Sequence, residues 1–194
     1  MVVDSCGSYQ KSARVSNISM TDSSSVEMVD IVDENDNVSH QATRGEAHQK
    51  GLLHRTTISE VRDSEGRWIM VKQSADRQDA GQYVSPVGGH VEAGETEDEA
   101  LKREAKEECG LSNFDYKLVG KAIFNRSVLG RQENHYFILY EIYSDAGKLQ
   151  LNHESESYKL FTTQELKDSL KRNPEMFGNA FHFVVTAFYP ELLA

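Results

Sequence analysis

The sequence predicts a mixed α/β fold in which helices cover a sheet. Runs rich in aromatic and β-branched residues alternate with at least two segments that open with helix-capping patterns. A chain of 194 residues is long enough for one domain with a sizeable core and too short for two comfortable ones. We therefore expect a single domain over residues 26–194. It follows a disordered, Ser-rich leader over residues 1–25, in which Met20 is a second candidate for the start.

The strands are predicted from aromatic and β-branched runs that are separated by polar or Gly-containing turns. In chain order they are a short hairpin from Val26, and then residues 51–61, 67–73, 83–89, 116–124, 135–143 and 157–161. The last segment, residues 177–193, is apolar and aromatic. It is expected to form a C-terminal helix that packs on the sheet.

Two further helices are predicted from their boundaries. A Thr-x-x-Glu capping box at residues 96–99 opens a helix over residues 97–109, and Gly110 stands where a left-handed residue ends a helix. A second capping box at residues 162–165 opens a helix that should end before Pro174.

Three carboxylates share one face of the helix over residues 97–109. At about 100° per residue, Glu104, Glu107 and Glu108 are neighbours beside the apolar stripe of that helix. Like charges at these spacings destabilise an isolated helix by a few tenths of a kcal/mol per pair. A cation is therefore expected among them, and the hard ions Mg²⁺ and Mn²⁺ suit oxygen ligands.

Residues 89–111 resemble the Nudix box, a motif with Gly, Glu and Arg at fixed spacings. All seven fixed letters are present, at Gly89, Glu95, Arg103, Glu104, Glu107, Glu108 and Gly110. The one soft departure is Ala105, where the motif prefers a larger aliphatic residue. The resemblance implies the α/β/α sandwich with a mixed sheet of the Nudix family. It also implies Mg²⁺-dependent hydrolysis of a diphosphate linkage in a nucleoside diphosphate derivative or a related diphosphate compound.

The same resemblance implies roles for individual residues. The carboxylates of Glu104, Glu107 and Glu108 would hold Mg²⁺, or alternatively Mn²⁺, together with the carbonyl of Gly88. Arg103 would brace the site through the loop residue Glu95. Which glutamate acts as the general base varies within the family, so that assignment stays open.

A further carboxylate from a late loop often completes the site in this family, as a metal ligand or a general base. Glu154 is the first candidate for it and Glu156 the second. Two solvated loop glutamates would explain the same sequence equally well.

Residues 26–170 also resemble the Nudix branch that includes isopentenyl-diphosphate isomerase. That isomerase has Cys-Gly-His, with a metal-binding His, where this chain has Gly-Gly-His at residues 88–90, and it has another His and a Glu that are matched by His54 and Glu154. The resemblance implies that His54, His90 and Glu154 could still gather a metal. The thiol for proton transfer is missing, so hydrolysis is the preferred function. His54 and His90 are interpreted as a strand-edge and a loop residue, and no other histidine shows a ligand-like spacing. A Nudix-fold binding module without catalysis is disfavoured by the intact acidic cluster.

The composition limits partners and location. A net charge of −10, from 31 acidic and 21 basic side chains, argues against nucleic-acid polymers and anionic membranes and leaves small phosphorylated molecules. No run approaches the roughly 18 apolar residues of a membrane span, and no signal-peptide pattern is present, so a cytoplasmic location is expected. Cys6 and Cys109 are not expected to form a disulfide, and Cys109 should be buried. A homodimer, common among Nudix relatives, stays open.

Overall fold

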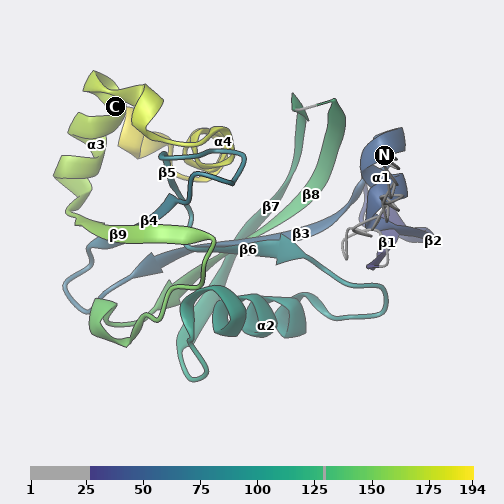
Figure 1. The fold of residues 1–194 in the computed structure, drawn as a ribbon, viewed down its shortest axis with the longest axis horizontal. Coiled ribbons are helices and arrows are strands. Elements are labelled where there is room, and N and C mark those ends of the chain that lie inside the picture. Colours follow the sequence, from purple (N-terminus) through teal and green to yellow (C-terminus); the bar gives the residue numbers. More distant parts are fainter. Residues whose placement is uncertain (1–26, 129) are drawn as a thin grey trace, which may run out of the picture.

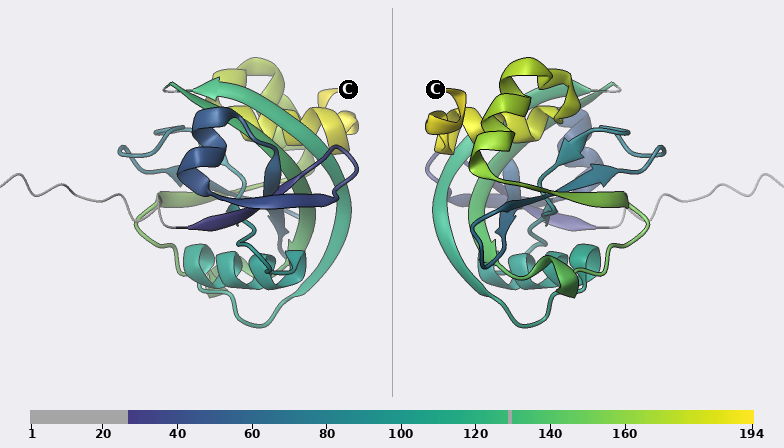
Figure 2. Two further views of the ribbon diagram at one scale, coloured as in Figure 1. Left: turned by 90° about the vertical axis from the view of Figure 1, so that its right-hand side faces the viewer. Right: turned by 90° about the vertical axis from the view of Figure 1, so that its left-hand side faces the viewer.

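The computed structural model describes residues 27–128 and 130–194, so the predicted leader and Cys6 lie outside the described residues. A curled nine-stranded sheet, with parallel and antiparallel pairs, forms the centre of the molecule (Figure 1). Helix α2 (Glu97–Cys109) lies on one side of this sheet, and the C-terminal helices lie on the other (Figure 2). The mixed α/β layering agrees with the prediction from sequence.

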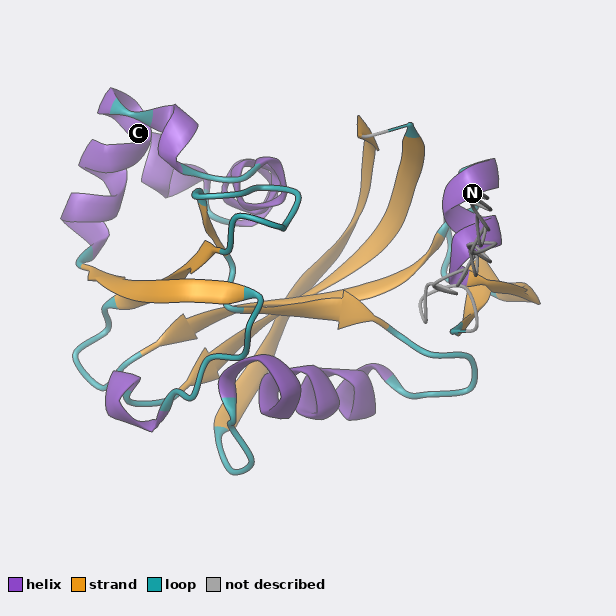
Figure 3. Cartoon of the chain, in the orientation of Figure 1, coloured by secondary structure: helices purple, strands orange, loops and turns teal. Residues whose placement is uncertain are grey.

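The strands alternate with loops as the sequence pattern predicts (Figure 3). They are β1 (Met28–Val32), β2 (Val38–Thr43), β3 (His54–Arg62), β4 (Trp68–Gln73), β5 (Tyr83–Val84), β6 (Val87–His90), β7 (Asp115–Val128), β8 (Arg131–Tyr143) and β9 (Ser155–Phe161). The run expected as one strand over residues 83–89 divides into β5 and β6 at Ser85 and Pro86, where proline has no N–H for the ladder. Strands β7 and β8 form a longer hairpin than expected.

Strand β3 organises the region that holds the site. It pairs in parallel with β8, so that His54 lies opposite His135, and antiparallel with β6, so that Thr56 lies opposite His90. Its first residues also meet β1, where Ile31 is the partner of His54. Parts of β1, β6 and β8, which are far apart in the sequence, therefore lie next to the first residues of β3.

The other helices are α1 (Arg44–Lys50), α3 (Thr163–Arg172) and α4 (Asn179–Phe188), and the 3₁₀ turns are η2 (Ala146–Lys148), η3 (Pro174–Met176) and η4 (Pro190–Leu193). Helices α2 and α3 begin at the predicted capping boxes. The expectation of one helix over residues 177–193 is wrong, because Pro190 cannot continue the hydrogen bonding of α4. Helix α1 was not expected; its seven residues are too few to show a clear helical period.

Two apolar clusters fix the helices to the sheet. On one face, Trp68 and Phe137 pack with Phe181 and other residues of α3 and α4. On the opposite face, Ile138 packs with Leu101 and the rest of the apolar stripe of α2. That stripe is fully buried, which orients the neighbouring acidic face of α2 towards β6. No helix within the described ranges combines the length and hydropathy that a membrane crossing requires.

Candidate active site

Helix α2 holds its carboxylates in a fixed orientation. Both hydrogen bonds of its capping box are formed, and Gly110 ends the helix in the left-handed conformation with φ of 68°. The Glu104 side chain is 12% exposed, while that of Glu107 is 59% exposed. The acidic face therefore runs from the buried interior of the cleft to solvent.

The two inner carboxylates are crowded by burial and by each other. Glu108 accepts a hydrogen bond from the backbone N–H of Gly88 at 2.7 Å. Burial raises the pKa of Glu108 well above its ordinary value, and the neighbouring carboxylates of Glu104 and Glu154 raise it further. Burial also raises the pKa of Glu104, although Arg103 acts in the opposite direction. Several oxygen donors in one small, negatively charged space fit a hard divalent ion such as Mg²⁺.

Glycine at position 89 is required by the close approach of α2 to β6. A Cβ atom at Gly89 would lie only 1.9 Å from Oε1 of Glu104. Any larger residue would push the Glu104 carboxylate away from its position. This contact explains why a glycine stands at position 89 of β6.

Arg103 connects the helix, the preceding loop and strand β6. Its guanidinium donates to both carboxylate oxygens of Glu95, at 3.0 and 2.9 Å, and to Oε1 of Glu104 at 2.5 Å. It also donates to the backbone oxygen of His90 at 2.9 Å. The contact predicted between Arg103 and Glu95 is present, and the bidentate geometry fixes the loop against the helix.

The late-loop carboxylate lies at the same cleft. The residues that line it include Glu104, Glu107, Glu108 and Glu154. Oε1 of Glu154 is held by Arg77 Nη2 at 2.8 Å. Glu156, the second candidate, pairs instead with Lys72 Nζ at 3.3 Å and is largely exposed. Of the two loop glutamates, the structure therefore places Glu154 with the acidic face.

A more apolar hollow adjoins the acidic cleft. Its walls include Ile58, Val71, Phe124 and Phe137. It shares a border with the acidic cleft, formed by Thr56, Gly88, Glu108 and Glu154. A molecule with a charged end and an uncharged body could thus occupy both spaces at once.

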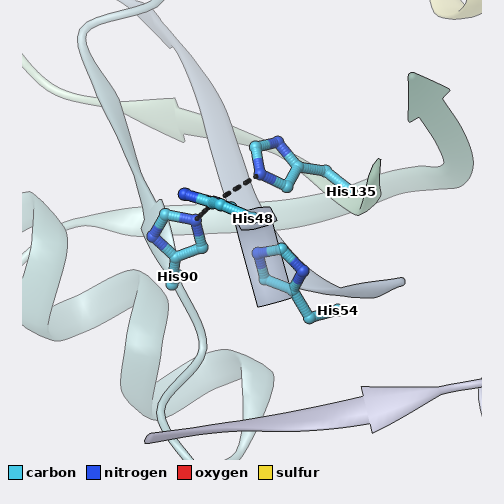
Figure 4. A group of neighbouring side chains, drawn as sticks. All are labelled: His48, His54, His90 and His135. Carbon is cyan, nitrogen blue, oxygen red and sulfur yellow. Dashed lines mark hydrogen bonds between the residues drawn. The ribbon is translucent and has the colours of Figure 1, made fainter. Parts of the chain in front are cut away.

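Four histidines form a second cluster beside this cleft (Figure 4). They are His48 from α1, His54 from β3, His90 from β6 and His135 from β8. One ring nitrogen from each lies within 4.8 Å of the other three. Burial lowers the pKa of all four, that of His48 to about 4, so the rings are neutral near pH 7.

The sequence interpretation of these histidines is corrected by this geometry. His54 and His90 are members of one cluster rather than an isolated strand-edge and an isolated loop residue. His48 and His135 belong to it too, although neither shows a ligand-like spacing in the sequence. The register of β3 with β6 and β8 was the missing information, because it alone brings three of the four together.

Comparison with known proteins supports the same family. A family profile described as NUDIX domain matches residues 52–179. An uncharacterized Nudix hydrolase of Streptomyces coelicolor is 47% identical over 93 residues, which is 47% of this chain and 51% of that protein. The chain is thus matched over about half the length of this relative. An isopentenyl-diphosphate Delta-isomerase of Serratia proteamaculans is 31% identical over 153 residues, covering 78% of this chain and 85% of that protein.

The fold is also similar to that of two solved structures. DR0079 from Deinococcus radiodurans superposes with a TM-score of 0.67 at 22% identity, covering 84% of this chain and 99% of that one. The MutT protein from Methanosarcina mazei gives a TM-score of 0.57 at 20% identity, covering 73% and 96%. The predicted sandwich with a mixed sheet is confirmed by these likenesses. With its family profile spanning most of the folded region, the chain belongs to the Nudix family.

Proposed function

We propose that the protein is a Mg²⁺-dependent hydrolase that cleaves a diphosphate linkage in a nucleoside diphosphate derivative or a related diphosphate compound. The observation that carries the proposal is the complete acidic face of α2, which lies in one cleft with Glu154. In the Nudix family this combination of residues belongs to diphosphate hydrolysis. Residues 26–194 are proposed as the single unit that performs it.

The proposed metal ligands are Glu104, Glu107 and Glu108, with the carbonyl of Gly88. A bound Mg²⁺ or Mn²⁺ would neutralise charge on the phosphoryl oxygens and lower the pKa of a water molecule. Burial, followed by neighbouring carboxylates, raises the pKa of Glu104 and Glu108, and a bound cation would favour the charged form of both side chains.

The remaining residues position the reacting groups or accept a proton. Arg103 holds Glu104 and the loop residue Glu95 in place, and we assign it a positioning role. Glu154 lines the same cleft, and Arg77 fixes its carboxylate, so it is our candidate for the base that accepts a proton from the attacking water. Glu107, the most exposed carboxylate of the face, is the alternative base.

The adjoining hollow supports a small phosphorylated substrate. Its apolar walls, which include Phe124 and Phe137, suit the uncharged part of such a molecule, while Arg126 supplies a positive charge nearby. Arg126 is already paired with Glu133 and lies 3.6 Å from Asp79, so it offers limited attraction to a polyanion. This arrangement favours a compact diphosphate compound over a nucleic-acid polymer.

An isomerase is the second candidate, because the Serratia relative has that activity in its name and matches most of this chain. The residue that matches the isomerase thiol is Gly88, which has no side chain. Within the described residues the one thiol is that of Cys109. Burial raises its pKa to about 12, and it donates to the backbone oxygen of Pro86. Cys109 therefore cannot take over the proton transfer.

The experiment is a screen of the purified protein against a panel of diphosphate compounds with Mg²⁺ or Mn²⁺, in which products are identified by mass. The panel contains nucleoside diphosphate derivatives, dinucleotide polyphosphates, sugar nucleotides and isoprenoid diphosphates. Two phosphorylated products from one compound would support hydrolysis. A product of unchanged mass would support isomerisation, and tight binding without product would support a binding module. A homodimer and a cytoplasmic location also stay predictions, and size-exclusion chromatography with light scattering tests the first.

A further inference from the structure

We propose that the β1–β2 hairpin positions the acidic face of α2, and that Asp30 and Lys121 are the positioning residues through which it acts. The hairpin is bonded to the loop before α2 at one end and, through Lys121, to the first residue of α2 at the other. The inference rests on the proposed hydrolysis, since it concerns the same carboxylates. It also makes claims about hydrogen bonds and metal affinity that can be tested without any substrate.

The loop before α2 contains a tight turn that carries Glu95, the partner of Arg103. Glu95 donates its backbone N–H to the carbonyl of Glu92 at 2.9 Å, and Glu92 donates its own N–H to Oε2 of Glu95 at 3.0 Å. Gly94 takes the third position of the turn with φ of 81°, where a type II turn requires a positive φ. Because the carboxylate of Glu95 also receives the guanidinium of Arg103, a shift of this turn would move Arg103 and the acidic face that it contacts.

The two middle N–H groups of this turn are bonded by β1. Ala93 donates to the carbonyl of Met28 at 2.8 Å, and Gly94 donates to Oδ2 of Asp30 at 3.0 Å. The other oxygen of Asp30, Oδ1, accepts from Nε2 of Gln41 at 2.9 Å, so β2 fixes the carboxylate that faces the turn. All four N–H groups of the turn are thus hydrogen-bonded, and the hairpin supplies half of the acceptors.

The far end of the hairpin is joined to α2 through Lys121 of β7. Asp36, in the turn between β1 and β2, accepts from Nζ of Lys121 at 2.9 Å, and the same Nζ donates to Oε1 of Glu97, the first residue of α2. Arg55 of β3 also holds Asp36, because its Nε donates to Oδ1 at 2.6 Å and its Nη2 to the backbone oxygen at 2.7 Å. None of these four side chains is more than 30% exposed, so salt screens their ion pairs less than pairs at the open surface.

The apolar core alone does not fix this end of α2. The buried residues of the helix begin at Ala100, so its first turn and the loop before it are held by polar contacts. Glu104 occupies the space that a Cβ at Gly89 would need, so a small displacement changes its surroundings. An error of about 1 Å in the position of a catalytic group can reduce the rate by about 100-fold. Because the hairpin acts through Arg103 and not on a carboxylate directly, its effect should be smaller than this.

Asp30→Ala tests the contact with the loop, and Asp30→Asn is its conservative partner. Alanine removes the acceptor for the N–H of Gly94, whereas the amide oxygen of asparagine can still accept from it. On the best compound of the panel, Asp30→Ala should lower kcat by about 3- to 10-fold with KM unchanged, and should raise the Mg²⁺ concentration for the half-maximal rate. Asp30→Asn and the exposed control Glu34→Ala should stay within about twofold of the wild type. Wild-type kcat and metal dependence in Asp30→Ala would overturn the proposal.

A double-mutant cycle distinguishes positioning from a general loss of stability. In Arg103→Lys the connection from Asp30 to the acidic face is already weakened, so adding Asp30→Ala should reduce kcat by less than about twofold further. An equal loss of kcat in both backgrounds would show that Asp30 acts independently of Arg103, and would overturn the proposal. Lys121→Gln covers the case in which Asp30→Ala does not fold. It should raise the Mg²⁺ concentration for the half-maximal rate in the same way, and an unchanged value would contradict the proposal.

Two measurements without substrate separate this proposal from the proposed function. In NMR spectra of the wild type, the amide of Gly94 should exchange with solvent at least about tenfold more slowly than in an unfolded chain, although Gly94 is exposed. This protection should be lost in Asp30→Ala. Binding of Mn²⁺, followed by electron paramagnetic resonance, should be weakened by about 3- to 10-fold in Asp30→Ala and restored in Asp30→Asn.

The two proposals then fail in different ways. If the exchange and Mn²⁺ results hold while no compound of the panel is cleaved, the positioning role stands and the proposed hydrolysis fails. A Gly94 amide without protection in the wild type, or equal Mn²⁺ affinity in the wild type and Asp30→Ala, would overturn the positioning role.

Discussion

The acidic face of α2 and the four-histidine cluster lie beside one cleft but differ in how the chain builds them. The carboxylates of the acidic face come from one helix, at spacings that the helical period alone brings together. The histidines come from one helix and three strands, and only the sheet register unites them. The first region offers crowded charged oxygens, and the second offers neutral nitrogens. The difference shows that one fold can place two regions of different ligand chemistry side by side.

The sharpest test of the acidic face is Glu108→Gln. Loss of this carboxylate should reduce Mg²⁺-dependent hydrolysis by about 100-fold or more, because the proposed ion loses a charged ligand while the helix keeps its shape. Steady-state kinetics on the best compound of the panel measures this effect. The matched control is Glu34→Gln in the exposed β1–β2 turn, and near wild-type turnover in Glu108→Gln would contradict the assigned role.

Gly89→Ala tests the same face without removing a carboxylate. The added Cβ would meet Glu104, so the carboxylate must move and turnover should fall by about 10- to 100-fold. Gly147→Ala is the control, because a Cβ there meets no atom within 4 Å. If Gly89→Ala retained full activity, the position of Glu104 would not matter for catalysis.

A smaller effect is expected for Arg103→Lys. Lysine keeps the charge but cannot make both bonds to Glu95, so the loop and Glu104 should be held less firmly. We expect about a tenfold loss of kcat and a higher Mg²⁺ concentration for the half-maximal rate, both measured by metal titration of the rate. A variant that lost only folding stability, with kcat unchanged, would argue against a positioning role.

Glu60 lies outside the candidate site, so its expected effect is on stability and not on activity. It is fully buried, accepts a hydrogen bond from Ser85 Oγ at 2.6 Å, and has a pKa raised by burial to about 7. The pKa of Glu60 is higher in the folded protein than in the unfolded chain, so protonation of Glu60 stabilises the fold. This stabilisation is complete below about pH 4.5 and is lost as the pH rises through about 7. Relative to Glu60→Gln, the wild type should lose about 1–3 kcal/mol of unfolding free energy between pH 5 and pH 8.

Urea unfolding at the two pH values measures the Glu60 effect, with the exposed Glu65→Gln as the control. An equal pH dependence in the wild type and Glu60→Gln would show that Glu60 does not titrate in this range. The buried carboxyl of Glu60 would then affect the pH dependence of the unfolding free energy no more than an exposed carboxyl does.

The two regions also show which features of the structure can be predicted from the sequence. The acidic helix, its caps and the contact between Arg103 and Glu95 follow from local spacing, and they were predicted. The position of Glu154 at the cleft depended on loop geometry, which residue spacing does not determine. The histidine cluster was missed because His54, His90 and His135 meet through pairing partners far apart in the chain. Helix α1, which carries His48, was missed as well because it is short and lacks an apolar period.

The most direct test of the central claim is the origin of the oxygen in the products. The wild type should be incubated with Mg²⁺ and its best diphosphate compound in water enriched in ¹⁸O, and the products weighed by mass spectrometry. Hydrolysis predicts incorporation of one ¹⁸O atom per cleavage into a phosphorylated product, with the rate strongly reduced in Glu108→Gln. A rearranged product without ¹⁸O, or equal incorporation by both proteins, would contradict the account.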